Sequence, residues 1–441
     1  MSDTVSSDKL LREFAPQIER TGKFGKLWIA FLCIVICYGW FALYWQVSRG
    51  HIVTGMRDNV VWGVYIVNFI FFMGISYAGA LISGTLHLFH AEWRKPIIRM
   101  AEFITIISLL IGPCFIMLCV GRLDRLPNLI LFGRIQSPIT WDVIAISTDI
   151  IGCILFLYLA LLRDLGKMRD FTELKVPQWQ KRMYKFLALG YTGTPDQQLR
   201  LKKATDVMAG MVIAIAIIVY SVLAWIFSVT LQPGWHSTIF GPYFVIAAVY
   251  SGTGVLIVAM YFFRKVYHLE EHITLQHFVN VGVIMLVLGA FFGYFTFSEY
   301  LTKWYGSEKN DEQLIQVLLK NYFNLFILSN YVGVLVPLIV VGFRKLRTIN
   351  NITIAAGIVV IALWINRYLI VVPTLETPYL PIQDAREAWQ HYSATWVEWA
   401  LTAAGVAMFC LLFTFGSKMI PIVQVSDLKE EPEQPGDLHL M

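Results

Sequence analysis

Ten apolar stretches, each long enough to cross a bilayer as a helix, run through this sequence of 441 residues. A transmembrane helix needs about 20 mostly apolar residues. Charged residues make up only 15% of the chain, against roughly 25% in soluble domains, so most of its surface cannot face water. The sequence therefore predicts an all-α polytopic membrane protein and excludes a disordered chain and a nucleic-acid binder. The predicted spans are 27–47, 61–88, 100–120, 141–162, 204–231, 241–263, 277–301, 321–343, 352–373 and 395–417.

Positive charge is unevenly distributed between the two sets of loops. The N-terminus, the even-numbered loops and the C-terminus hold 25 of the 35 Lys and Arg residues, and the odd-numbered loops hold 9. Cytoplasmic loops carry the excess of Lys and Arg, so both termini are expected in the cytoplasm. The long loop 163–203 belongs to this basic set, and its segment 179–186 (WQKRMYKF) is typical of an interfacial amphipathic helix.

A faint internal repeat indicates how the spans are grouped. Residues 62–65 (WGVY) and 240–243 (FGPY) share an aromatic-Gly-x-Tyr start, and residues 77–79 (YAG) and 250–252 (YSG) share a Tyr-x-Gly centre. Each copy opens a run of four spans in the same direction, as in membrane folds built from repeats. The expected units are a cytoplasmic segment 1–26, a membrane domain 27–417 with two four-helix bundles at about 61–231 and 241–373 and two peripheral helices, and a cytoplasmic acidic tail 418–441.

Cysteine and histidine positions argue against a bound cofactor. All six cysteines fall inside apolar runs and none forms a CxxC pair, which is typical of small packing residues rather than of zinc or iron–sulfur ligands. A haem in a helical bundle needs histidines that project inward from facing helices, and no histidine lies at mid-membrane depth. The sequence predicts no haem, metal or flavin in this chain. The alternative is a haem near the inner face, with His87 or His90 paired to His277.

Ionisable residues inside spans are costly and usually functional, and here they gather toward the outer face. Asp142 and Asp149 lie seven residues apart in the fourth span, hence on one helix face. Asp142 has the alternative of capping the helix start. Asp149 lies two turns deeper and must be neutral, paired or hydrated. The remaining polar members are Glu299, Asn366, Arg367 and Glu398.

This polar group indicates a cavity open to the outer leaflet. Arg367 is the natural partner for one of the acids, either as an ion pair that locks helices together or as a cation that orients a headgroup. Glu299 has the alternative of snorkelling to the interface. With Asp149, these two residues and Asn330 are the candidate proton-transfer residues.

Motifs at the outer ends of the spans resemble those of the NrfD/PsrC membrane subunits, and the resemblance runs from about residue 25 to 417. The ten-span form looks most like the ActC and ActF subunits of alternative complex III, or the equivalent subunit of a periplasmic-facing quinone reductase complex. The motifs are 121–125 (GRLDR), 136–142 (QSPITWD), 233–243 (PGWHSTIFGPY), 295–300 (FTFSEY), 367–373 (RYLIVVP) and 380–386 (LPIQDAR).

The resemblance implies a cofactor-free subunit of the bacterial inner membrane that binds a quinone, here expected to be menaquinone, near the outer face. Electrons would pass to or from a ferredoxin-type iron–sulfur subunit docked there. Further expected partners are a multihaem cytochrome c, other membrane subunits and a second NrfD-like subunit. Quinol-oxidising members commonly have His, Asp and Glu where this chain has Cys119, Ile226 and Asn366. These departures leave open quinol oxidation, quinone reduction and a non-catalytic role.

Quinone chemistry couples two electrons to two protons, so a headgroup needs hydrogen-bond partners and a carboxylate or imidazole that exchanges protons with water. Asp142, supported by Arg122 and Cys119, lies at a suitable depth, and Tyr65 and Asn68 of the second span are expected to line the pocket. The leading hypothesis is a quinone-interacting subunit of a respiratory complex. The alternatives are a structural or proton-translocating subunit of the same complex and a secondary transporter, which the peripheral charges disfavour.

Overall fold

The computed structural model describes residues 12, 14–19, 21–171, 173–230, 232–377 and 391–424, and the regular structure in this part of the chain is helical throughout. Ten helices are long and apolar enough to cross a membrane, which confirms the predicted fold class. The motif at 380–386 and the tail from residue 425 onward lie outside the described residues. The spans are α2 (Lys23–Arg49), α3 (Gly63–Leu88), α4 (Ile98–Val120), α6 (Pro138–Asp170), α8 (Pro195–Ser228), α9 (Phe240–Val266), α10 (Leu275–Gly306), α12 to α13 (Phe323–Gly342), α14 (Ile349–Leu375) and α15 (Trp396–Met419).

Short helices occupy several of the connections. α7 is amphipathic, as the basic loop predicts, and it lies outside the spans. A π-helical turn, η4, interrupts the eighth span between α12 and α13. The short helices of the connections are η1 (His51–Val53), η2 (Glu92–Arg94), η3 (Leu123–Arg125), α5 (Asn128–Leu131), α7 (Gln178–Leu187), α11 (Lys309–Lys320) and η5 (Arg344–Leu346). The eighth span consists of α12 (Phe323–Ile327), η4 (Leu328–Val332) and α13 (Gly333–Gly342).

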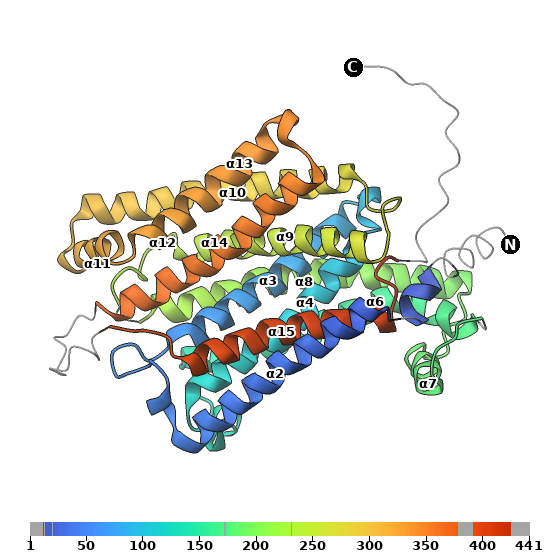
Figure 1. Ribbon diagram of the computed structural model, residues 1–441, viewed down its shortest axis with the longest axis horizontal. Helices are drawn as coiled ribbons and strands as arrows, with labels where there is room; N and C mark the ends of the chain where they lie inside the picture. The colour runs from blue at the N-terminus through green and yellow to red at the C-terminus, as the bar shows by residue number, and fades with distance from the viewer. Residues whose placement is uncertain are drawn as a thin grey trace.

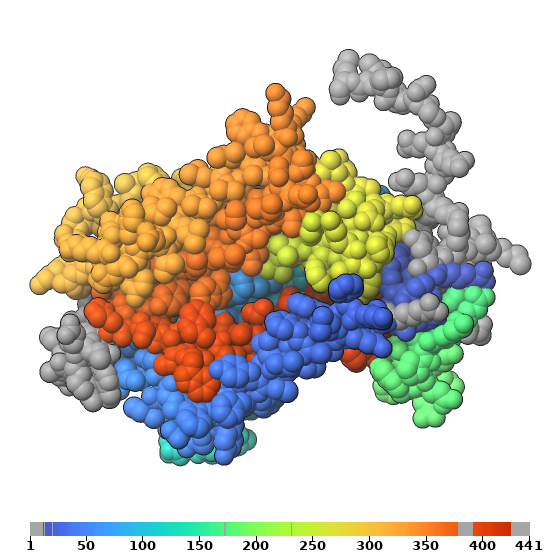
Figure 2. Space-filling view, viewed as in Figure 1, coloured from blue at the N-terminus to red at the C-terminus, as the bar shows by residue number. Residues whose placement is uncertain are grey.

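The helices α3 and α9 form the centre of the molecule and pack against each other. In the most apolar 18-residue stretch of α3, 89% of the residues are buried, whereas in the corresponding stretch of α2 only 22% are buried. The helices α4 and α8 pack against α3, and α6 packs against α8 and α4; we call α3, α4, α6 and α8 the first helix group (Figure 1). The helices α10 and α14 pack against α9, and α13 packs against α10 and α14; we call α9, α10, α13 and α14 the second helix group. The helices α2 and α15 lie together along one face (Figure 2), where α2 exposes large apolar side chains such as Phe31 and Trp40. Such a surface suits contact with lipid.

Both glycines of the Tyr-x-Gly repeat lie where helices cross closely. A Cβ added at Gly252 of α9 would overlap the Cβ of Ala78 on α3. A Cβ added at Gly79 of α3 would overlap the Thr105 hydroxyl and crowd the Ala101 carbonyl on α4. Small residues allow membrane helices to approach closely, so the repeat marks packing contacts of the two central helices.

The connections gather at two ends of the helix bundle (Figure 1). We call them the α7 end and the α11 end after the short helix that each carries. The helix α2 begins and α15 ends at the α7 end, where the Tyr184 hydroxyl of α7 donates to the Met419 carbonyl at 2.7 Å. The five motifs of the family resemblance that the structure describes lie at or near the α11 end.

Candidate functional site

Two buried carboxylates of α6 form the centre of the candidate site. Asp142 is 6% exposed and Asp149 is 1% exposed. The alternative in which Asp142 caps the helix is wrong, because α6 begins at Pro138 with Ser137 as its N-cap. The Cys153 thiol donates to Asp149 Oδ1 at 3.4 Å, but Asp149 Oδ2 and Asp142 Oδ1 have no hydrogen-bond partner among the described residues. Both carboxylates therefore keep hydrogen-bonding capacity in the interior.

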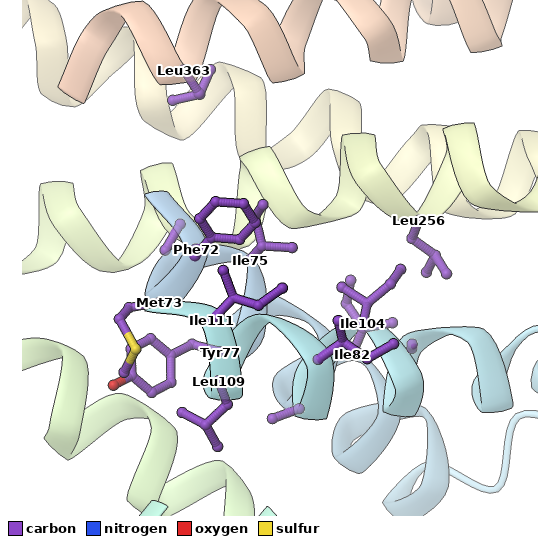
Figure 3. Close-up of a cluster of buried hydrophobic side chains, with 14 of the residues drawn as sticks. Phe72, Met73, Ile75, Tyr77, Ile82, Ile104, Leu109, Ile111, Leu256 and Leu363 are labelled. Carbon is purple, nitrogen blue, oxygen red and sulfur yellow. The ribbon is translucent and has the colours of Figure 1, made fainter. Parts of the chain in front are cut away.

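A pair of tyrosines lies between α3 and α8, and its member Tyr77 lies near these carboxylates. The rings of Tyr77 and Tyr220 meet edge to face with centroids 4.9 Å apart, and Figure 3 shows Tyr77 next to Met73 in the apolar core. Tyr77 lies within electrostatic range of both Asp142 and Asp149. Buried polar groups normally have partners in protein or in ordered water, so this cluster is suited to hold water or a polar ligand. Further buried atoms without a described partner here are Tyr77 OH, Tyr220 OH, Ser76 Oγ and Ser108 Oγ.

The structure does not bring Arg122 to Asp142. The Arg122 side chain is 64% exposed and pairs with Asp124, with Nη2 3.1 Å from Oδ2. Its guanidinium holds the pKa of the Asp124 carboxyl below the ordinary value. The connection from α4 to α6 contains η3 and α5. Cys119 is partly buried at the end of α4, where its thiol lies 3.8 Å from the Trp62 carbonyl oxygen.

Tyr65 and Asn68 are buried in α3 but face other helices. The Tyr65 hydroxyl donates to Gln46 Oε1 of α2 at 2.5 Å. Asn68 donates to the Thr402 hydroxyl at 2.7 Å and accepts from Trp364 Nε1 at 2.9 Å. Both side chains therefore belong to a satisfied network toward α2, α14 and α15, and no described contact joins them to Asp142.

Glu398 organises this second network. It is fully buried, in a capping box with Thr395 at the start of α15. Its carboxylate also accepts from the Gly55 backbone N–H at 2.7 Å and from the Tyr392 hydroxyl at 2.5 Å. Burial and the Glu398 charge raise the pKa of Tyr392, whose hydroxyl accepts from the Val64 N–H. Glu398 thus joins Gly55 and Tyr392 to the start of α15.

His51 lies over the Gly-Arg motif. Gly121 has φ +73°, a left-handed conformation that favours glycine, and an added Cβ would lie 3.0 Å from His51 Nε2. Burial lowers the pKa of His51, and the Glu398 charge opposes this only in part. The absence of a side chain at Gly121 therefore allows the His51 imidazole to lie close to the backbone of this motif.

The polar residues of the second helix group form a separate cluster. Glu299 is 6% exposed, accepts from the Ser237 hydroxyl at 2.5 Å and forms an ion pair with Lys303. The alternative in which Glu299 snorkels to the interface is therefore wrong, since its carboxylate is held inside by partners on two segments.

Arg367 has a different environment from the one predicted. Its guanidinium lies over the Phe244 ring, 4.6 Å from the centroid, with Nη2 3.4 Å from the Phe244 carbonyl oxygen. The predicted ion pair with an acid is wrong, because among the described residues Arg367 forms none. Its neighbour Asn366 exchanges hydrogen bonds with Tyr243 and lies 3.5 Å from Asn330 Oδ1. Asn330 itself lies in the π-helical turn.

A buried charge cluster at the α7 end was missed in the sequence. Arg99 Nη2 lies 2.8 Å from Asp164 Oδ2, Arg99 Nε lies 3.8 Å from Glu102 Oε2, and all three residues are at most 3% exposed. Arg99 and Asp164 lie just outside the predicted apolar stretches, so they were assigned to loops. The signal available was Glu102, an acid inside a predicted span.

A cavity of about 450 Å³ opens at the α7 end and reaches Glu102. His87 lines it, with Nε2 2.7 Å from Asp206 Oδ1 and Nδ1 3.1 Å from Arg94 Nη2. Both ring nitrogens of His87 are thus engaged, and His277 Nδ1 accepts from the Thr274 N–H in a helix cap. His90 lines the same cavity, and no described contact joins it to His277.

A narrow void continues from this cavity into the first helix group. Glu102 and Phe156 line both spaces, and Cys153 lines the void only. The Cys153 thiol in turn contacts Asp149. Glu102 and Cys153 therefore lie on one small void, with mainly apolar side chains between the α7-end cavity and Asp149 of α6.

Comparison with known proteins assigns the class. The family model described as "Polysulphide reductase, NrfD" matches residues 52–378, so this chain belongs to the NrfD/PsrC family of integral membrane proteins. It is 22% identical, over 92% of its length and 95% of the relative's, to the Hdr-like menaquinol oxidoreductase integral membrane subunit of Archaeoglobus fulgidus. It is 20% identical, over 90% and 94%, to a selenate reductase subunit of Mesobacillus selenatarsenatis. A putative dimethyl sulfoxide reductase membrane subunit of Halobacterium salinarum is 28% identical, and the match spans about half of each chain (55% and 53%).

Proposed function

We propose that this chain is the quinone-interacting membrane subunit of a respiratory oxidoreductase complex, with menaquinone as the quinone. Family membership supports the class, and the Archaeoglobus relative is by name a subunit of a menaquinol oxidoreductase. The expected partners are an iron–sulfur subunit and a catalytic subunit, since two relatives are by name single subunits of larger reductases. A multihaem cytochrome c and a second NrfD-like subunit follow only from the resemblance to ActC and ActF.

The observation that carries the proposal is the pair of incompletely satisfied carboxylates beside two unpartnered phenols. Asp142 and Asp149 provide proton acceptors, and Tyr77 and Tyr220 provide hydroxyls for a headgroup or for water that relays protons. Oxidation of a quinol releases two electrons to the iron–sulfur partner and two protons to such acceptors, and reduction of a quinone runs the same exchange in reverse. We place the headgroup near Asp142, with Arg122 outside the pocket.

The orientation supports an iron–sulfur partner at the α11 end. The basic set of loops and both ends of the ten-span region lie at the α7 end. Under the positive-inside rule that end faces the cytoplasm. The α11 end, nearest to Asp142, then faces the outside, and electrons enter or leave there.

The test is Asp142→Asn in the intact complex. The amide keeps the shape but cannot accept a proton, so quinone-linked turnover should fall by about 10²-fold while the complex still assembles. Asp124→Asn is the matched control, because Asp124 is exposed at the same end and pairs with the exposed Arg122. Unchanged turnover in Asp142→Asn, with quinone still bound, would contradict the proposed site.

The second candidate function, proton translocation, is favoured by one observation: the cavity at the α7 end reaches Glu102, and the void beyond it leads to Cys153 and Asp149. In this role Glu102 would take protons from the cytoplasmic side. Glu102→Gln should then abolish proton uptake in proteoliposomes while quinone-linked turnover continues. Equal loss or retention of both activities would exclude this role.

A further inference from the structure

We propose that the α11 end carries a binding site for a divalent transition-metal ion, formed by His236, Glu308 and Asp311. The ligand atoms of these three side chains lie within 4.8 Å of one another. His236 lies between α8 and α9, Glu308 precedes α11, and Asp311 lies in its first turn. The site is separate from the quinone proposal and departs from the expectation that the chain holds no metal.

Asp311 provides the observation that requires a partner. It is only 5% exposed, and its Oδ1 has no hydrogen-bond partner among the described residues. Two other buried acids at this end differ, since Glu398 accepts several hydrogen bonds and Glu299 pairs with Lys303. A buried carboxylate is tolerated when it is paired or binds a metal, and a cation at this position would meet that need.

Local backbone geometry brings the histidine to α11. Gly234 has φ +82°, and an added Cβ would collide with Leu314, one turn beyond Asp311. This close approach places the following residues against α11. Lys303 already donates to the Gly234 carbonyl at 2.8 Å and pairs with Glu299, so its charge is engaged beside the site.

The donor set indicates the class of ion. One imidazole and two carboxylates suit Zn²⁺ and similar first-row ions, whereas Mg²⁺ and Ca²⁺ prefer oxygen ligands alone. Two carboxylates balance the charge of a divalent ion. His236 and Glu308 are exposed, which gives the ion access from water and leaves positions for water ligands.

A bound ion would connect α11 to the segment between α8 and α9. That segment also carries Trp235, which stacks on Trp62 and donates to the Ile370 carbonyl at 2.8 Å, and Ser237, which donates to Glu299. The ion would thus fix the outer ends of both helix groups to α11.

The experiment is a Zn²⁺ titration of the full chain in detergent after chelator treatment. We expect one saturable site per chain, at least tenfold weaker in Asp311→Asn and in His236→Gln. Asp124→Asn and His391→Gln, which change exposed side chains outside the triad, should bind as the wild type does. Thermal unfolding checks folding: without metal the variants should unfold near the wild-type midpoint, and Zn²⁺ should raise the midpoint only where all three ligands are present.

Three results would overturn the proposal. These are no saturable Zn²⁺ binding to the wild type, equal affinity in the wild type and both ligand variants, and tighter binding of Ca²⁺ or Mg²⁺ than of Zn²⁺. Substitution with Co²⁺ adds a spectroscopic readout, since d–d absorption bands should appear in the wild type and weaken in Asp311→Asn.

Discussion

The rings of Tyr77 and Tyr220 meet edge to face with centroids 4.9 Å apart, and neither hydroxyl has a described hydrogen-bond partner. The pair joins α3 to α8 beside the buried carboxylates of α6. A structural pair of this kind would normally direct its hydroxyls to acceptors. This region therefore differs from the network around Glu398: here two neighbouring phenol hydroxyls lack a described hydrogen-bond partner, whereas the Glu398 carboxylate accepts several hydrogen bonds.

Replacing these tyrosines should separate function from stability. Tyr77→Phe removes a hydroxyl without a protein partner, so the free energy of unfolding should change by less than about 1 kcal/mol. If that hydroxyl serves a headgroup or relay water, quinone-linked turnover should fall several-fold. Tyr392→Phe is the contrast, because it removes a bond to Glu398 and should lower the thermal midpoint. Unchanged turnover in Tyr77→Phe would place the headgroup elsewhere.

Loss of the Glu398 carboxylate should destabilise the chain. Glu398→Ala leaves the Gly55 and Thr395 N–H groups and the Tyr392 hydroxyl without their acceptor. With about 1–3 kcal/mol for each unsatisfied buried group, we expect a loss of several kcal/mol, measured by thermal unfolding in detergent. Glu173→Gln, at an exposed pair with Arg12, should change stability by no more than about 1 kcal/mol. Comparable effects of both substitutions would contradict the assignment.

The buried charges at the α7 end should depend on one another. Arg99→Met removes the cation that pairs with Asp164 and lies near Glu102, and breaking a buried pair typically costs about 3–5 kcal/mol. The double variant Arg99→Met with Asp164→Leu should regain part of that loss. A double-mutant cycle on thermal midpoints measures the coupling, and additive effects would show that the pair is not coupled.

His51 should make stability fall on acidification. Burial lowers its pKa below the ordinary value of 6.5, so the unfolded chain binds a proton at a higher pH than the folded chain does. Stability is then fully present above about pH 6.5 and decreases as pH falls through the unfolded value toward the folded one. His51→Gln should flatten this decrease between about pH 7 and 5 in thermal unfolding. His391→Gln is the control, and an equal slope in wild type and His51→Gln would refute the linkage.

The topology has a direct test. Ten spans and the excess of Lys and Arg at the α7 end predict that a reporter fused after Met441 is cytoplasmic. A reporter inserted in the connection that holds α5 should be external. A periplasmic C-terminal reporter would reverse the membrane orientation and place Asp142 near the cytoplasm.

The number of spans, their approximate limits and the helical class were predictable because hydrophobicity is a local property of about 20 consecutive residues. The burial of Asp149 was predictable for the same reason, since two turns inside an apolar helix leave a carboxylate no route to water. The limits of α6 and α8 could not be predicted in this way. Both helices continue beyond their apolar stretches into helical turns rich in charged residues, which hydrophobicity does not detect.

Which polar side chains meet was decided by the tertiary structure alone. Tyr65 and Asn68 turn to Gln46 and Thr402 instead of Asp142, and Arg367 lies over a ring instead of beside an acid. A helix such as α3 is mainly apolar on every side, so its sequence has no amphipathic pattern that would predict which face packs against which neighbouring helix. The sequence by itself determined that this chain has ten helices able to span a membrane, with acids in the interior. The rotation and packing of the helices decided which of those acids are satisfied and which remain available for chemistry, because that depends on contacts between residues far apart in the chain.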